Sequence, residues 1–138
     1  MIVLDTNVVS EPTKQQPNPA VRAWFNAQAP ETLFLTSVTV AELLFGLAIM
    51  PKGKRREQLQ QSTDRILHAF SARTLVFDVE AGRRYAELAL AVRKSGHGFP
   101  MPDAYIAAIA KANNMSVATR DVVPFAAAGL KVINPWKA

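Results

Sequence analysis

Four acidic residues of this chain follow or adjoin short apolar segments, and together their side chains have the chemistry to hold a cation. They are Asp5, Glu42, Asp103 and Asp121. Clustered carboxylates repel one another and raise one another's pKa unless a cation neutralises them. Ligand sets made only of oxygen select hard divalent ions such as Mg²⁺ or Mn²⁺. Because an ion held in this way activates water and stabilises a leaving oxygen, the expected chemistry is hydrolysis of phosphodiester bonds.

Each of the four acids also has a purely structural explanation. Asp5 and Asp121 stand where the N-cap of a helix is expected, and Asp103, next to a proline, suits the first turn of a helix. The segment from Thr39 to Glu42 has the spacing of a capping box, in which Glu42 would bond a backbone N–H. These explanations do not account for the apolar neighbours of Asp5, Glu42 and Asp103, or for the lack of adjacent lysine and arginine. Both interpretations therefore stay open from the sequence alone.

The pattern of apolar and turn residues predicts short strands that alternate with helices. Strands are expected at residues 1–4, 33–36, 74–77, 116–118 and 131–133. Helices are expected at residues 19–28, 38–49, 54–70, 79–95, 102–112 and 122–128, with a loop or broken helical turn at 10–19. Strands separated by helices need crossover connections, so the expected fold class is α/β, a parallel sheet of four to five strands sandwiched by helices. The whole chain, residues 1–138, is expected to form one domain.

This topology predicts that the four acids meet at one edge of the sheet. A helix that follows a parallel strand begins at the carboxyl edge of that strand. Asp5 follows the first strand, Asp121 follows the fourth, and Glu42 lies one to two turns into the helix after the second. Asp103 opens a helix that returns through a tight turn to the fourth strand, so its start lies at the same edge. Open parallel sheets bind ligands at this edge, and we expect one acidic cleft there with Asp121 at its margin.

The composition points to a polyanionic partner and excludes several classes of chemistry. Sixteen basic and eleven acidic residues give a net charge of +5 and a pI near 9.9, which favours binding to phosphate-rich molecules. The absence of cysteine excludes disulfides, thiolate catalysis and cysteine-bound zinc. No stretch approaches the ~18 apolar residues of a membrane span, and no signal peptide is recognisable. We expect a soluble cytoplasmic protein with no membrane partner.

Four blocks of sequence surround the acids. They are Ile2 to Asn7, Ser37 to Leu43, Pro102 to Ala108, and Ala118 to Asp121 continued by Ile133 to Trp136. In this order and spacing the blocks resemble the PIN-domain family, and within it the VapC and FitB toxins of bacterial toxin–antitoxin pairs. The resemblance spans essentially the whole chain and implies a Mg²⁺- or Mn²⁺-dependent ribonuclease with the four acids as its catalytic metal ligands. It also implies a homodimer and a DNA-binding antitoxin that fills the active site and links the toxin to operator DNA.

The chain departs from this family pattern at one place. Many relatives have Asn where Asp121 stands and a further acid three residues on, and that place is occupied here by Pro124. Of the four expected ligands, Asp121 therefore has the weakest support, and it would bind the metal either directly or through water.

Polar residues beside the acids are candidates for supporting roles. Thr6, Asn7 and Thr119 would orient the acids or their waters, or else cap helix termini. Arg120 lies next to the proposed site and is expected to contact a substrate phosphate.

Other polar residues are more distant in the sequence. Lys52 and Lys54 are further candidates for phosphate contacts, although a basic run of this kind also suits a solvated helix start. His68 and His97 have no second histidine or serine at a functional spacing, so we expect structural or surface roles for both.

The acidic cleft suggests how a partner protein would inhibit the chain. A guanidinium pairs with carboxylates through two parallel charge-assisted hydrogen bonds and can replace a metal ion there, so the partner is expected to insert an arginine. The early helices also carry more apolar bulk than one small core requires, and some of it is expected to form a groove for a helix of the partner. These apolar residues are Trp24, Phe25, Leu44, Phe45 and Leu47.

Two competing functions remain. A strand that ends in Asp-Thr also opens haloacid-dehalogenase-like phosphotransferases, but these carry a second Asp two residues on, where this chain has Asn7. The other alternative is a non-catalytic module that binds nucleic acid or a partner and uses its acids only as caps. Metal-dependent cleavage of RNA would exclude this second alternative.

Overall fold

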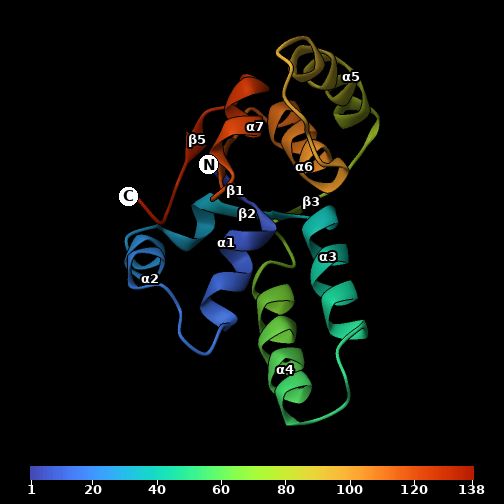
Figure 1. Ribbon diagram of the computed structural model, residues 1–138. Coiled ribbons are helices and arrows are strands. Elements are labelled where there is room, and N and C mark those ends of the chain that lie inside the picture. The colour runs from blue at the N-terminus through green and yellow to red at the C-terminus, as the bar shows by residue number, and fades with distance from the viewer.

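A computed structural model describes all 138 residues and contains one parallel sheet with helices on both faces (Figure 1). The strands are β1 (Ile2–Leu4), β2 (Leu33–Thr36), β3 (Thr74–Leu75), β4 (Ser116–Ala118) and β5 (Val132–Ile133). Their order in the sheet is β3-β2-β1-β4-β5, and every neighbouring pair is parallel. The predicted α/β class with a parallel sheet is therefore confirmed, and β1 occupies the centre.

Seven α-helices connect or follow these strands. They are α1 (Thr6–Ser10), α2 (Pro19–Asn26), α3 (Ser37–Ala48), α4 (Lys54–Ala69), α5 (Val79–Lys94), α6 (Met101–Ala112) and α7 (Val122–Ala127), with 3₁₀ turns at Glu11–Thr13 and Pro30–Thr32. The side chains of Asn18, Thr36 and Asp78 accept backbone N–H groups at the starts of α2, α3 and α5. Caps of this kind depend on local sequence, which explains why these helix starts were predictable. None of the helices combines the length and apolar character needed to cross a membrane.

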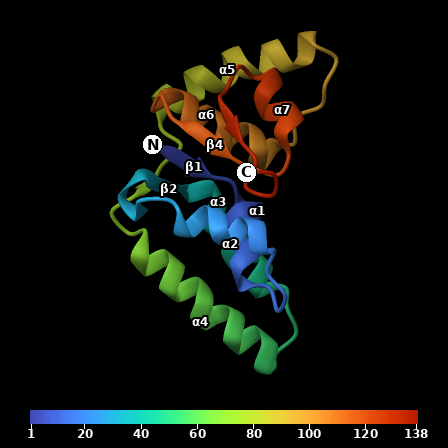
Figure 2. The ribbon, with the colours of Figure 1, turned by 90° about the vertical axis from the view of Figure 1, so that its left-hand side faces the viewer.

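The core is divided by the sheet into two apolar layers. Neighbouring residues of a strand point to opposite faces, so Val3 packs with Ile106 and Phe125 while Leu4 packs with Val8 on the other side. Figures 1 and 2 show α5, α6 and α7 on the first face and α1, α2 and α4 on the second. Both faces of β1 are thus covered, as expected of a central strand made of continuous apolar residues.

One edge strand is shorter than predicted. A strand was expected at 74–77, but Leu75 pairs with Thr36, the last residue of β2, before the chain enters α3. Val76 and Phe77 have no strand beside them and are exposed. The predicted end of this strand was wrong because the length of an edge strand is limited by its neighbour.

The apolar residues assigned to a groove on the early helices fall into two groups. Trp24 and Leu47 are buried in the core, so they are not among the residues of this set that could face a partner. Leu44 is exposed and Phe45 is 66% exposed, while Phe25 is partly buried against the core. Only the outer face of α3 therefore presents unpartnered apolar side chains from this set.

Candidate metal-binding site

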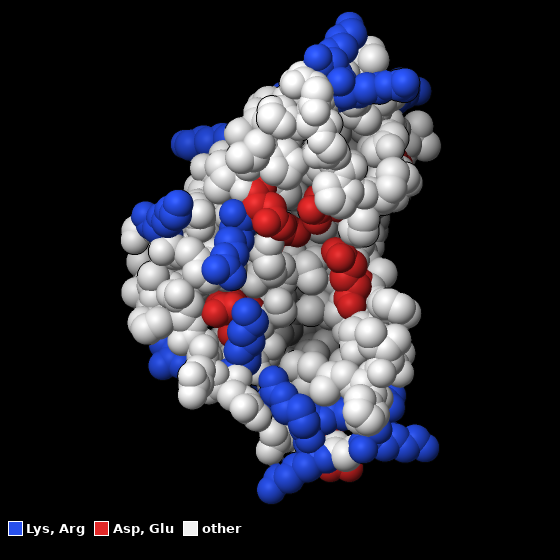
Figure 3. All heavy atoms as spheres, in the orientation of Figure 1, with Lys and Arg blue, Asp and Glu red and all other residues white.

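The four acids lie at the carboxyl edge of the sheet on four different elements. Asp5 directly follows β1, and Asp121 stands between β4 and α7. Glu42 lies in the second turn of α3, and Asp103 lies in the first turn of α6. Acidic atoms gather near the middle of the face shown in Figure 3, beside a hollow, and basic side chains flank them. The fold thus brings together acids separated by up to 116 positions in the sequence.

Asp5 is the most deeply buried of the four, with 2% of its surface exposed. Its Oδ1 accepts the backbone N–H of Thr6 at 2.8 Å, and its Oδ2 accepts the hydroxyl of Thr119 at 2.7 Å. Burial raises the pKa of Asp5 to about 6, against the opposing effect of these two hydrogen bonds. The negative charges of Glu42 and Asp121 add smaller upward contributions to this pKa.

Asp103 is half-buried, and its pKa is also raised. Burial is the largest cause that raises the pKa of Asp103 to about 7, and the charges of Asp5, Asp121 and Glu42 contribute smaller parts of this shift in that order of size. No basic side chain is among the causes of the shift at Asp103 or at Asp5. The site therefore favours either a bound proton or a bound cation.

Asn7 and Thr119 connect the ends of β1 and β4. The side-chain amide of Asn7 donates to Oδ2 of Asp121 at 3.3 Å and, at 3.4 Å, to Oδ2 of Asp5. Oδ1 of the Asn7 side chain accepts the backbone N–H of Arg120 at 3.3 Å, and Oγ1 of Thr119 accepts the backbone N–H of Asp121 at 3.0 Å. Asn7 and Thr119, two of the three residues predicted to orient the acids, therefore contact them directly.

Among Asp5, Glu42 and Asp121, only Asp5 makes a hydrogen bond that caps a helix. The hydroxyl of Thr6 donates to Oε1 of Glu42 at 2.7 Å. The backbone N–H of Thr39, which Glu42 would accept in a capping box, donates instead to Oγ1 of Thr36, the N-cap residue of α3. A capping box at Glu42 is therefore wrong. Asp121 occupies the N-cap position of α7 without a capping hydrogen bond, whereas Asp5 does cap α1 through Thr6.

An arginine borders the acids. Asp103, Asp121 and Arg120 line the same open pocket of about 490 Å³. The guanidinium carbon of Arg120 lies 5.2 Å from the centre of the Trp136 ring, a distance typical of a cation–π contact. A positive charge is thus held at the wall of the pocket, next to two of the carboxylates.

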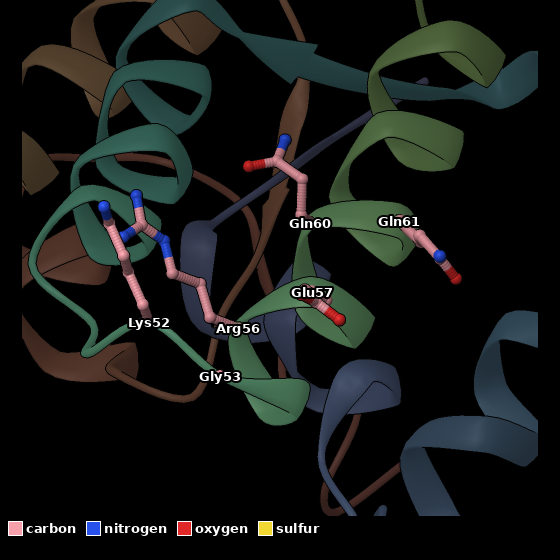
Figure 4. Close-up of a pocket in the computed structure, with 6 residues that line it drawn as sticks. All are labelled: Lys52, Gly53, Arg56, Glu57, Gln60 and Gln61. Carbon is pink, nitrogen blue, oxygen red and sulfur yellow. The ribbon is translucent and has the colours of Figure 1, made fainter.

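Two basic residues near position 54 line a different pocket. Lys52 and Arg56 line an open space of about 480 Å³ at the turn between α3 and α4, and Figure 4 shows their side chains extending in the same direction. Lys54 is exposed at the first residue of α4 and does not line this space. His68 and His97 are both exposed, away from the residues that line either pocket. The remaining lining residues of the α3–α4 pocket are Gly53, Glu57, Gln60 and Gln61.

The donor chemistry of the acidic cleft fits a hard divalent ion that keeps part of its water shell. All the candidate ligands are carboxylate oxygens, and two of them, on Asp5 and Asp103, have raised pKa values that a cation would lower. No three Asp, Glu or His side chains lie close enough together to enclose one ion as they stand. Because Mg²⁺ commonly retains several waters and binds one or two carboxylates directly, this spacing suits a hydrated ion better than a closed cage.

The sequence pattern did not single out one buried carboxylate near this edge. The side chain of Glu11 is 6% exposed, its Oε1 accepts the N–H of Asn18 at 3.1 Å, and its Oε2 lies 2.7 Å from Nζ of Lys14. The hydrogen bond from Lys14 is the main cause that lowers the pKa of Glu11, and the charge of Arg120 contributes. The i,i+3 spacing of Glu11 and Lys14 was the available signal.

The fold and the site together define a parallel α/β domain with carboxylates gathered at the carboxyl edge of its sheet, and comparison with known proteins identifies its family. The family model of the PIN domain matches residues 2–129. The chain belongs to the PIN-domain family, which confirms the resemblance seen in the sequence.

Among individual proteins, the chain is 53% identical over 138 residues to one named VapC ribonuclease Y4jK, from Sinorhizobium fredii. It is 43% identical over 140 residues to one named Toxin FitB, from Neisseria gonorrhoeae. Both alignments cover 99% of this chain and 99% of the relative. The fold is also similar to the crystal structure of FitAcB from Neisseria gonorrhoeae, with a TM-score of 0.94, 41% identity and complete coverage of both chains.

Proposed function

We propose that this chain is a Mg²⁺- or Mn²⁺-dependent endoribonuclease toxin that hydrolyses phosphodiester bonds of RNA. The observation that carries the proposal is the gathering of four acids at one sheet edge, where no basic group offsets the raised pKa values of Asp5 and Asp103. The net charge of +5 favours a polyanionic substrate. Relatives named as a VapC ribonuclease and as Toxin FitB support RNA as the substrate and toxicity as the role. Action on RNA would place the protein in the cytoplasm.

In this proposal the chain's own residues hold and orient the acids. The residues proposed to hold the hydrated metal ion, directly or through its bound waters, are Asp5, Glu42, Asp103 and Asp121. The bound ion supplies an activated water and neutralises charge on the leaving oxygen. The backbone N–H of Thr6 and the hydroxyl of Thr119 fix the directions of the two oxygens of the Asp5 carboxylate. The side-chain amide of Asn7 donates a hydrogen bond to Asp121 and so fixes the position of that acid. A cation bound here also keeps Asp5 and Asp103 ionised at neutral pH.

Arg120 is the residue we propose to bind a phosphate of the RNA. Its guanidinium borders the pocket that Asp103 and Asp121 line. Lys52 and Lys54 lie beyond the C-terminal end of α3, so they would contact only phosphates farther along the strand. Phosphate contacts of this kind position the substrate without reading its sequence.

The same cleft is the proposed site of inhibition. A small DNA-binding antitoxin would insert an arginine between the carboxylates, since a guanidinium bonds two carboxylate oxygens at once. The exposed Leu44 and Phe45 on α3 offer an apolar surface for a helix of that partner. The family resemblance further implies a homodimer and a larger assembly that binds operator DNA through the antitoxin.

The decisive experiment compares RNA cleavage by the wild-type protein and by Asp103→Asn, with Mg²⁺ or Mn²⁺ and with a chelator. We expect wild-type cleavage only with metal and a loss of about a hundredfold or more in the variant. The melting temperature of metal-free Asp103→Asn should stay the same or rise by roughly 2–4 °C, because removing one charge relieves repulsion. Asp64→Asn, at an exposed position of α4, is the matched control and should cleave like wild type.

Other outcomes would favour the competing functions. Cleavage that persists with a chelator, or a large fall in the melting temperature of Asp103→Asn, would contradict the metal role and support a structural one. Metal binding without cleavage would favour the non-catalytic module. Metal-dependent hydrolysis of small phosphomonoesters would favour phosphotransfer, although Asn7, at the position of the second acid of that class, is an amide bonded to Asp121.

A further inference from the structure

A series of hydroxyl groups connects the end of β2 to the carboxylate of Glu42. Its members are Thr36, Thr39 and Thr6, and we call it the threonine chain. Oγ1 of Thr36 lies 3.4 Å from Oγ1 of Thr39, which lies 3.1 Å from Oγ1 of Thr6. Oγ1 of Thr6 is 2.7 Å from Oε1 of Glu42. Thr36 and Thr39 are fully buried, so these hydroxyls have no solvent to bond instead.

The number of hydrogens determines the direction of every hydrogen bond in the threonine chain. A hydroxyl donates one hydrogen and accepts up to two, whereas an ionised carboxylate only accepts. Thr6 donates its hydrogen to Glu42, so the bond between Thr6 and Thr39 must be donated by Thr39. The hydrogen of Thr39 is then used, and Thr36 must donate to Thr39. All three donors therefore point along the chain towards the carboxylate.

Both ends of the threonine chain are anchored by backbone groups. Oγ1 of Thr36 accepts the N–H of Thr39 at 3.1 Å and thereby caps α3. The N–H of Thr6 donates to Oδ1 of Asp5 at 2.8 Å. Thr6 thus contacts two of the acids, Asp5 and Glu42. It is itself hydrogen-bonded to Thr39, at the junction of β2 and α3. The hydroxyl of Thr39 takes no part in the cap, so capping alone does not explain its position.

We infer that Thr39 is a positioning residue for the metal site, acting through Thr6 to hold Oε1 of Glu42. The inference rests on the proposed function and extends it beyond the acids. Glu42 makes its hydrogen bond through Oε1, which leaves Oε2 to face a cation. Without the Thr39 hydroxyl, that of Thr6 has no buried donor to orient it, and the long side chain of Glu42 loses its fixed direction. Partners that orient metal ligands in this way typically affect metal affinity or activity by about 10–100-fold.

The test replaces Thr39 and measures Mn²⁺ affinity by calorimetric titration of the protein without RNA. Thr39→Val removes the hydroxyl while keeping the shape of the side chain, and its dissociation constant for Mn²⁺ should rise about 10–100-fold. Thr39→Ser restores the hydroxyl and should restore near wild-type affinity. Thr63→Val makes the same change at a buried threonine of α4 and should leave the affinity unchanged. Thr39→Cys, a weak donor of similar size, should give an intermediate affinity and replaces the valine variant if that one does not fold.

A second measurement tests the route through Thr6. If Thr39 acts only by way of Thr6, then adding Thr39→Val to Thr6→Val should cause no further loss of Mn²⁺ affinity. Wild-type affinity in Thr39→Val, an equal loss in Thr63→Val, or additive losses in the double variant would each overturn the inference. Absence of RNA cleavage by a wild-type protein that binds Mn²⁺ would instead overturn the proposed function and leave this positioning role standing.

Discussion

The hydroxyl of Thr119 donates a hydrogen bond of 2.7 Å to Oδ2 of Asp5 and so joins residues 114 positions apart in the sequence. Both side chains are buried, and the same hydroxyl oxygen accepts the backbone N–H of Asp121 at 3.0 Å. One threonine at the end of β4 therefore orients the carboxylate at the centre of the cleft and the backbone of the acid at its margin.

Replacing Thr119 is expected to change the pH dependence of RNA cleavage. The hydrogen bond from Thr119 lowers the pKa of Asp5, so its removal in Thr119→Val moves that pKa above about 6. Cleavage by this variant at subsaturating Mn²⁺, where a proton competes with the ion for Asp5, should fall roughly tenfold near that pH and recover towards wild type as the pH rises. Thr119→Ser should keep the wild-type profile. A loss of equal size at every pH would show that Thr119 acts on something other than this ionisation.

The stability of the metal-free protein should decrease as the pH rises towards neutrality. The pKa values of Asp5 and Asp103 are about 6 and about 7 in the folded protein, above the ordinary value of 3.8. Between about pH 4 and pH 7 the folded state therefore binds more protons than the unfolded state, and the free energy of unfolding falls as these protons are lost. Above this window it should be constant until other groups titrate.

Urea denaturation between about pH 4 and pH 7, with a chelator present, tests whether the free energy of unfolding falls as the pH rises. Asp103→Asn should show a shallower fall because it has one less group to deprotonate. Saturating Mn²⁺ should raise the stability most on the neutral side of the window, where both carboxylates are ionised. A wild-type protein whose free energy of unfolding rises from the acidic to the neutral end of the window would contradict the assignment.

The contact between Arg120 and Trp136 is expected to assist substrate binding. Arg120→Ala should raise KM for RNA roughly tenfold with little change in kcat, and should reduce the slope of log K against log salt by about 1. Trp136→Ala should have a smaller effect in the same direction, since the guanidinium loses the ring that holds it, and Trp136→Phe should be close to wild type. Arg93→Ala, at an exposed arginine of α5, serves as the control. An equal response of Arg120→Ala and Arg93→Ala would assign the effect to net charge alone.

Inhibition by the proposed antitoxin should depend on arginine. A peptide from the partner's tail should block RNA cleavage and compete with Mn²⁺, and replacing its arginines with lysine should weaken it because lysine cannot bond two carboxylate oxygens in a fork. The peptide should also bind Asp103→Asn more weakly than wild type. A complex whose acidic cleft stays open, or a tail that inhibits equally without any arginine, would disprove this mode of inhibition.

Apart from the short helix α1, which was not among the predicted helices, the element order and the position of the acids followed from the sequence because the signals responsible are local. Caps such as Thr36 and Asp78 act over three residues, and the apolar run Ile2–Leu4 is sufficient to indicate a buried strand. Crossover connections between parallel strands then bring Asp5 and Asp103 to the same edge without any further information. PIN-domain membership was also recognisable at this level, from the order and spacing of four sequence blocks.

Only the tertiary structure decided what each acid contacts. The spacing of Thr39 and Glu42 was compatible with a capping box, yet Glu42 bonds Thr6 because β1 lies beside β2 in the sheet. The raised pKa of Asp5 depends on its burial, and the end of β3 depends on where β2 stops. Helix and strand signals operate between residues close in sequence, whereas side-chain partners and desolvation depend on the packing of segments that the chain brings together only when it folds.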